Sequence, residues 1–123
     1  MDINNLINEI QQYISSIEDL DEKVDAINRI RDGISQVSPF RDEPTDCVLW
    51  VKQEAVHANE YNPNRIPSPE MQLLHTSIRE DGYTMPIVCY HDKEQDQYII
   101  VDGFHRYRIM LDHPDIYERE GGM

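Results

Sequence analysis

The sequence predicts an α+β fold: a helical hairpin at the N-terminus, followed by a mixed sheet with helices. Two patterns support this prediction. Between residues 3 and 34 the apolar residues recur at alternating steps of three and four, which is the period of an amphipathic helix. After residue 46, short runs rich in β-branched and aromatic residues alternate with segments of helical pattern. We therefore expect a helical unit at residues 1–38 and a sheet-containing unit at residues 45–123, joined by a proline-bounded linker.

The apolar stripe of the N-terminal segment fits two arrangements. It contains Ile3, Leu6, Ile10, Tyr13, Ile17, Leu20, Val24, Ile27 and Ile34. No proline or glycine precedes Gly33, so a single long helix that dimerises with a second copy fits the pattern. A hairpin fits as well, because Asp19 can cap a second helix with Glu22 three residues further on, as in a capping box. Further isoleucines widen the stripe beyond a two-stranded seam, so we favour a hairpin that packs or binds a partner.

The sheet-containing unit is expected to hold three strands and two helices. The strands are predicted at residues 47–51, 86–90 and 98–101. The second and third strands flank a polar turn and are expected to pair as a hairpin. A serine and a proline at residues 68–69 begin the first helix, and Gly82 stands where its left-handed C-terminal residue belongs. The second helix follows Gly103 and ends before Pro114, and residues 118–123 form a polar tail.

The chain is strongly acidic. It has 24 aspartates and glutamates against 11 lysines and arginines, and its formal net charge is −13. The acidic excess is shared between the part before residue 47 and the part after it, so neither is basic. Non-specific binding to a phosphate backbone needs clustered basic residues, because counterion release supplies most of its affinity. Direct DNA binding by this chain is therefore not expected.

The sequence also bears on the compartment. No segment has the ~18 consecutive apolar residues of a membrane span. The N-terminal stretch MDINNLINEI lacks the basic start and apolar core of a signal peptide. Cys47 and Cys89 form neither a CxxC pair nor a metal-ligand spacing. We therefore expect a cytoplasmic protein in a reducing compartment, with no membrane association and no metal site.

The segment VDGFHRYR, residues 101–108, is where a predicted buried strand turns directly into a helix. The first N–H groups of a helix lack partners within it and carry partial positive charge, so such an end can bind an anion. Gly103 lets a ligand approach the backbone closely. Arg106 can hold phosphate oxygens through parallel N–H donors, and His105 can donate a further hydrogen bond. Arg108 is a further cationic candidate.

A simpler alternative treats this segment as a plain helix start. Asp102 would then cap the helix, and the histidine and arginine of the first turn would be solvated. If a polyphosphate does bind, Asp102 must either face away as a cap or hold a Mg²⁺ ion that bridges to the phosphates. We favour the cap.

The same segment carries a family resemblance. DGFHRYR resembles the GxxRxR box of the N-terminal domain of ParB partition proteins, and it is similar to the glycine–cysteine–histidine–arginine box of sulfiredoxins. The order of predicted elements over residues 47–112 resembles this ParB/sulfiredoxin superfamily as well. The stretches SPF, EPTDCVLWV, ANEYNPN and YIIVDGFHRY look like IbrB-type proteins, which are ParB-like co-activators of prophage genes.

The resemblance implies a nucleotide site. In these families the box binds nucleotide phosphates, CTP in ParB proteins and ATP in sulfiredoxins. Here that role falls on the box residues already named as candidates. Ser77 resembles a hydroxyl residue that touches phosphate in sulfiredoxins. The asparagine–proline turn lies near the same pocket in the family, so it supplies weaker candidates, with a plain turn as the alternative. These are Asn62, Asn64 and Arg65.

Position 104 bears on whether the chain is an enzyme. Sulfiredoxins have their catalytic cysteine there, and ParB proteins usually have a glutamate linked to CTP turnover. Phe104 offers neither a thiolate nor a carboxylate, so sulfiredoxin activity is not expected and ParB-type hydrolysis is disfavoured. Asp102 and Glu60 are the weak catalytic candidates that remain for a nucleotide-dependent enzyme, whether an NTP hydrolase or a phosphoryl-transfer enzyme like the ParB-like serine kinase.

These features predict a ParB-like regulatory module that binds a nucleotide and supports transcription through a protein partner. The resemblance implies an IbrA-type partner, a protein like the sulfotransferases and reductases. A homodimer through the N-terminal helices, a nucleotide-dependent enzyme and a module whose box binds nothing are the alternatives. The chain ends about where the family continues with another strand, so we expect a fragment or a short form that lacks the DNA-reading helix-turn-helix of ParB proteins.

Overall fold

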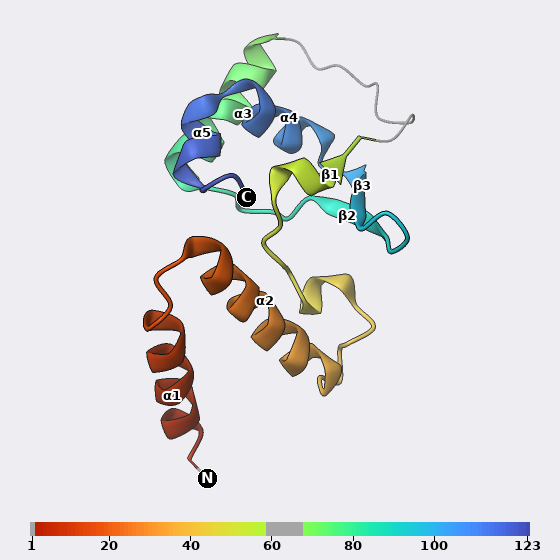
Figure 1. Ribbon diagram of the computed structural model, residues 1–123. Helices are drawn as coiled ribbons and strands as arrows, with labels where there is room; N and C mark the ends of the chain where they lie inside the picture. Colours follow the sequence, from red (N-terminus) through yellow and green to blue (C-terminus); the bar gives the residue numbers. More distant parts are fainter. Residues whose placement is uncertain (1, 59–67) are drawn as a thin grey trace. The chain divides into compact units, whose positions relative to one another are not determined.

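The computed structural model describes residues 2–58 and 68–123 (Figure 1). They form two compact units, of which the first ends at Trp50 and the second begins at Val51. Within the described residues, none of the helices combines the length and the hydropathy that a membrane crossing needs.

The first unit contains two separate helices, α1 (Ile3–Ser15) and α2 (Leu20–Gln36). The break between them falls directly before Leu20, where Asp19 is predicted to cap a second helix. The Asp19 carboxylate caps α2 by accepting a hydrogen bond from the backbone N–H of Glu22 at 3.0 Å. Asp2 caps α1 in a similar way. The chain therefore forms a helical pair rather than one long helix, because a carboxylate at residue 19 satisfies N–H groups that begin a new helix.

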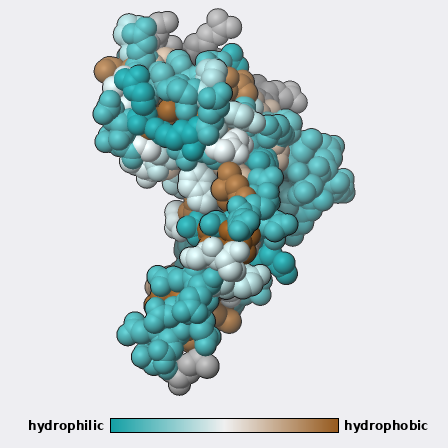
Figure 2. All heavy atoms as spheres, turned by 60° about the vertical axis from the view of Figure 1, so that its left-hand side comes forward, coloured by the Kyte–Doolittle hydropathy of each residue, from teal (hydrophilic) through white to brown (hydrophobic). Residues whose placement is uncertain are grey.

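Much of the apolar stripe of this unit stays exposed. Helix α1 buries none of its residues. The exposed large apolar side chains of the two helices are Ile3, Leu6, Ile7, Ile10, Tyr13, Leu20 and Ile34. Figure 2 shows one face of the molecule, on which hydrophilic residues predominate and hydrophobic residues form separate patches.

The predicted strand at residues 47–51 is wrong. After the short 3₁₀ helix η1 (Pro44–Asp46), the chain runs without regular structure. The Asn28 side chain on α2 donates to the Trp50 carbonyl at 2.6 Å and accepts from the Trp50 N–H at 3.0 Å. Arg31 donates to the carbonyl of Val48. These side chains of α2 satisfy the backbone groups that a neighbouring strand would otherwise pair, so the apolar run needs no sheet.

The second unit contains a mixed sheet with helices. In chain order its elements are η2 (Gln53–Ala55), β1 (Val56–His57), α3 (Ser68–Asp81), β2 (Val88–Asp92), β3 (Gln97–Asp102), α4 (Phe104–Asp112) and α5 (Pro114–Arg119). The strand order is β1-β3-β2, with β1 parallel and β2 antiparallel to β3. The predicted hairpin is confirmed, with Tyr90 opposite Ile99 and an irregularity between Val88 and Cys89. The α+β fold class is therefore confirmed.

Three helices meet around the core of this unit. Its buried members are Ile78, Ile109, Met110 and Ile116, and Met71, Leu74, Tyr83 and Tyr117 pack against them. These residues belong to α3, α4 and α5, except Tyr83, which follows α3. The third helix was missed: the sequence predicted no helix after Pro114. His113 is extended, Pro114 stands at the first helical position, and Ile116 is fully buried, so one turn of helix is stabilised by packing.

The polar end of the chain is also held in place. The Gly122 carbonyl accepts a hydrogen bond from the N–H of Gln53 at 2.8 Å. The Tyr117 hydroxyl donates to the Glu54 carboxylate at 2.6 Å. The end predicted to be a polar tail therefore lies beside η2.

Tyr83→Phe is expected to leave the second unit equally stable, or up to about 1 kcal/mol more stable, at pH 7. The Tyr83 hydroxyl is buried and has no hydrogen-bond partner among the described residues, and an unpaired buried polar group is costly. Burial, helped by the charge of Glu120, raises the pKa of Tyr83 to about 12. In the unfolded chain the hydroxyl of this tyrosine ionises nearer pH 10. The wild type should therefore lose stability between pH 10 and 12, and the variant should be spared the part of this loss that Tyr83 contributes.

Urea unfolding at pH 7 and at pH 11 measures both effects. Tyr117→Phe is the matched control, because its hydroxyl donates to Glu54. That variant should be less stable than the wild type at pH 7. A comparable loss in Tyr83→Phe would mean that the Tyr83 hydroxyl has a partner after all.

Candidate functional site

The candidate site is the turn at which β3 passes into α4. Gly103 lies at the N-cap of α4 with φ 97° and ψ 22°, in the left-handed region. Its carbonyl accepts the first helical hydrogen bond, from the N–H of Tyr107 at 3.0 Å. None of the side chains that the structure describes caps the helix. The predicted cap by Asp102 is therefore wrong: Asp102 is exposed at the end of β3, opposite Val88. The first N–H groups of α4 thus lack a side-chain acceptor among the described residues.

Arg106 folds back over this turn. Its Nη2 donates to the carbonyl of Pro86 at 3.0 Å, which links α4 to the segment before β2. A Cβ atom added to Gly103 would lie 2.7 Å from that Nη2 and 3.3 Å from the Cα of Ile87. Arg106 Nε is buried and has no partner among the described residues. The space that a side chain at residue 103 would fill is therefore occupied by the guanidinium.

The other predicted residues are placed as follows. His105 is half-buried in the first turn of α4, with its ring edge-on to Phe104 at a centroid distance of 5.7 Å. The Arg108 Nε binds the Asp112 carboxylate one turn further along the helix at 3.0 Å. Ser77 is exposed on α3, and no hydrogen bond among the described residues joins it to the turn. The structure thus gathers Gly103, His105 and Arg106 in a single turn.

Four further candidates cannot be placed. Asn62, Asn64, Arg65 and Glu60 lie outside the described residues.

Neither cysteine is an activated nucleophile. Burial raises the pKa of the Cys89 thiol in β2. Burial and the negative charges of Asp32 and Asp46 raise the pKa of the Cys47 thiol. A thiol whose pKa is raised stays protonated at neutral pH, and the thiolate is the reactive form. Neither cysteine therefore replaces the catalytic thiolate that sulfiredoxins have where this chain has Phe104.

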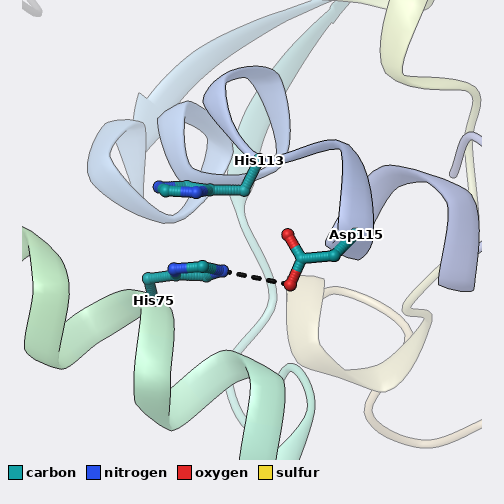
Figure 3. Close-up of side chains that lie close together, drawn as sticks. All are labelled: His75, His113 and Asp115. Carbon is teal, nitrogen blue, oxygen red and sulfur yellow. Dashed lines mark hydrogen bonds and ion pairs between the residues drawn. The ribbon is translucent and has the colours of Figure 1, made fainter.

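Sequence reasoning missed a second cluster of polar side chains in this unit. His75, His113 and Asp115 lie close together, although α4 and the whole sheet hairpin separate the first from the others along the chain (Figure 3). The only local signal is the run His-Pro-Asp at residues 113–115, of which the first two are predicted to end a helix. Only the packing of α3 against the following helices reveals the cluster.

Comparisons with known proteins find one family model and a curated relative that match this chain. A family model described as the ParB N-terminal domain matches residues 41–113, which include the whole sheet and all of α4. The chain is 49% identical over 104 residues to a protein of Escherichia coli (strain K12) named "Uncharacterized protein YbdM". The alignment covers 85% of this chain and 49% of that protein, so the chain spans about half the length of this curated relative. No solved structure matches the chain.

Proposed function

Because the chain belongs to the ParB N-terminal domain family, we propose that it binds the phosphates of a nucleotide at the turn from β3 into α4. The observation that carries this proposal is the helix end itself. Gly103 is left-handed, and no side chain of residues 2–58 or 68–123 caps α4, so among these residues nothing competes with an anion for the first N–H groups and the positive end of the helix dipole. CTP and ATP, with or without Mg²⁺, are the candidate ligands.

Under this proposal Arg106 changes partner when the nucleotide binds. At present its guanidinium donates to a neutral carbonyl, that of Pro86, and leaves Nε without a partner among the described residues. A hydrogen bond to a phosphate oxygen joins two opposite charges and can be bidentate, which a single neutral carbonyl cannot offer. A phosphate at the helix end could therefore draw the guanidinium away from Pro86. Nucleotide binding would then loosen the link between α4 and the segment before β2.

The proposed role is regulatory, as in the IbrB-type co-activators that the sequence resembles. Phe104 provides no catalytic group. A net charge of −13 disfavours direct contact with DNA. The exposed apolar residues of α1 offer a surface for a protein partner or for a second copy of the chain. Under this proposal the partner is of the IbrA type, and nucleotide binding modulates the complex.

Arg106→Ala is expected to weaken nucleotide binding by ~1.5–3 kcal/mol, or roughly 10- to 150-fold, which is the usual scale for a charged hydrogen bond. Isothermal titration with CTP, ATP and ADP, each with and without Mg²⁺, measures the affinity. Arg79→Ala is the matched control, because Arg79 is an exposed arginine on α3. Equal affinities for the wild type and Arg106→Ala would contradict the assignment of Arg106.

The same titrations separate the proposed module from an enzyme. Release of phosphate or diphosphate during the titration would favour the alternative function, and loss of turnover in Asp102→Asn would identify that carboxylate as its catalytic group. Binding without turnover supports the regulatory role. The absence of heat with every nucleotide, from a folded protein, would contradict both.

A further inference from the structure

Three metal-ligand side chains converge beside the core of the second unit. His75 comes from α3, His113 is the N-cap residue of α5, and Asp115 lies in the first turn of α5. One ligand atom from each lies within 4.8 Å of the other two (Figure 3). We propose that these residues bind a divalent transition-metal ion of the Zn²⁺ class. This inference rests on the cluster alone and is independent of the nucleotide proposal.

The cluster is more than an ordinary ion pair. His75 Nε2 lies 3.2 Å from the Asp115 carboxylate, and the rings of His75 and His113 stack at a centroid distance of 3.6 Å with planes 18° apart. Each imidazole can offer a nitrogen lone pair to a metal, so the two rings and the carboxylate present three ligand atoms in one place.

Another histidine of this unit, His91, has an ion pair and a ring stack without a second imidazole. His91 pairs with the Asp96 carboxylate at 3.0 Å and stacks on Tyr98 at 4.5 Å. That site has a similar ion pair and a similar stack, but its stacking partner is a phenol rather than a second imidazole. Residue 113 is thus what distinguishes the two sites, because it adds a third metal ligand.

The three ligands stand on well-anchored backbone. The His113 N–H donates to Ile109 at 3.0 Å, and its carbonyl accepts from the N–H groups of Ile116 and Tyr117. The helices that carry them pack together through Ile78, Ile109 and Ile116. The His75 side chain is 18% exposed, whereas that of Asp115 is 50% exposed, so an ion can enter from solvent. Such pre-organisation is what a metal site needs.

The donor set indicates the kind of ion. Two imidazole nitrogens and one carboxylate oxygen suit Zn²⁺ and its neighbours, whereas Mg²⁺ and Ca²⁺ prefer oxygen ligands alone. Three protein ligands leave one tetrahedral position for water. At Zn–N distances of 2.0–2.1 Å, tetrahedral ligand atoms lie about 3.3 Å apart. The in-plane lone pairs of the two stacked rings are nearly parallel, so both rings would have to turn about their Cβ–Cγ bonds before these lone pairs meet at one ion.

A bound ion would tie α3 to α5. All of α4, with the candidate nucleotide turn at its start, lies between His75 and His113 along the chain. The ion would therefore close a loop that contains this helix and stabilise the folded form of the second unit.

The test uses the full chain, treated with a chelator and then titrated with Zn²⁺ in a calorimeter and with Co²⁺ by absorption spectroscopy. We expect one ion per chain, together with a rise of several degrees in the thermal unfolding midpoint with Zn²⁺ but not with Mg²⁺. His75→Gln, His113→Gln and Asp115→Asn should each weaken Zn²⁺ binding by roughly tenfold or more. His91→Gln is the matched control and should bind as the wild type does.

Circular dichroism shows whether each variant is folded. If a variant is unfolded, the titration and melting curves of the wild type test whether the chain binds Zn²⁺. Absence of saturable Zn²⁺ binding by the folded wild type would overturn the proposal. Full affinity in folded His113→Gln would also overturn it, because the third ligand would then be dispensable. Binding that is lost in His91→Gln or His105→Gln, but kept in His75→Gln, would place the ion elsewhere and overturn it too.

Discussion

Ile109→Ala is expected to lower the free energy of unfolding of the second unit by about 2–5 kcal/mol. Ile109 is fully buried and belongs to the cluster in which α3, α4 and α5 meet. Its removal leaves a cavity between Ile78 and Ile116, and the helices that line the cavity relax only partly. Because Ile109 stands on α4, the variant should also loosen the helix that begins at the candidate site.

Urea unfolding followed through the backbone amide NMR signals of the second unit measures this loss separately from the first unit. Leu111→Ala is the matched control, because Leu111 lies on the same helix and is 44% exposed. That variant should lose less than about 1 kcal/mol. Similar losses in the two variants would mean that α4 is not fixed by the face that carries Ile109.

Gly103→Val is expected to cost about 2–4 kcal/mol in the same experiment and to abolish measurable nucleotide binding. The left-handed conformation at φ 97° is strained for any residue with a Cβ atom, and more so for a β-branched one. The added Cβ would also collide with the guanidinium of Arg106 and press on the backbone of Ile87. The valine must therefore either displace Arg106 from Pro86 or distort the start of α4.

Two other glycines separate the causes of this loss. Gly82 has φ 75° but open space around it, so Gly82→Ala should show conformational strain alone, about 1 kcal/mol. Gly33 lies in α2 with open space and no positive φ, so Gly33→Ala should be neutral or stabilise the first unit by about 0.5–1 kcal/mol. A Gly103→Val protein that is stable and binds nucleotide would show that neither the strain nor the close approach matters.

The sequence predicted those elements whose cause is local. Asp19 caps α2 through an N–H group three residues away, so the break between the helices could be seen in a short window. The hairpin of β2 and β3 follows from two apolar runs around a polar turn, in which Asp96 takes the left-handed conformation at φ 51°. The start of α4 was also predicted from a local signal, the glycine at residue 103.

What the sequence did not predict depends on partners far away in the chain. Residues 47–51 have the composition of a strand, and only the position of Asn28 on α2 shows why they do not form one. The contact between Arg106 and the Pro86 carbonyl spans 20 residues, and His75 meets Asp115 across 40. No pattern of spacing reports such contacts, because they arise from how helices pack rather than from their own periodicity.

The most direct test of phosphate binding at the start of α4 is an NMR titration of the ¹⁵N-labelled chain with CTP and with ATP. We expect the largest saturable shifts at the backbone amides of residues 103–107. Ile87 should shift with them, because Arg106 leaves the adjacent carbonyl. If saturating nucleotide leaves the chemical shifts of these amides unchanged, or changes only signals elsewhere in the chain, phosphate binding at the start of α4 is contradicted.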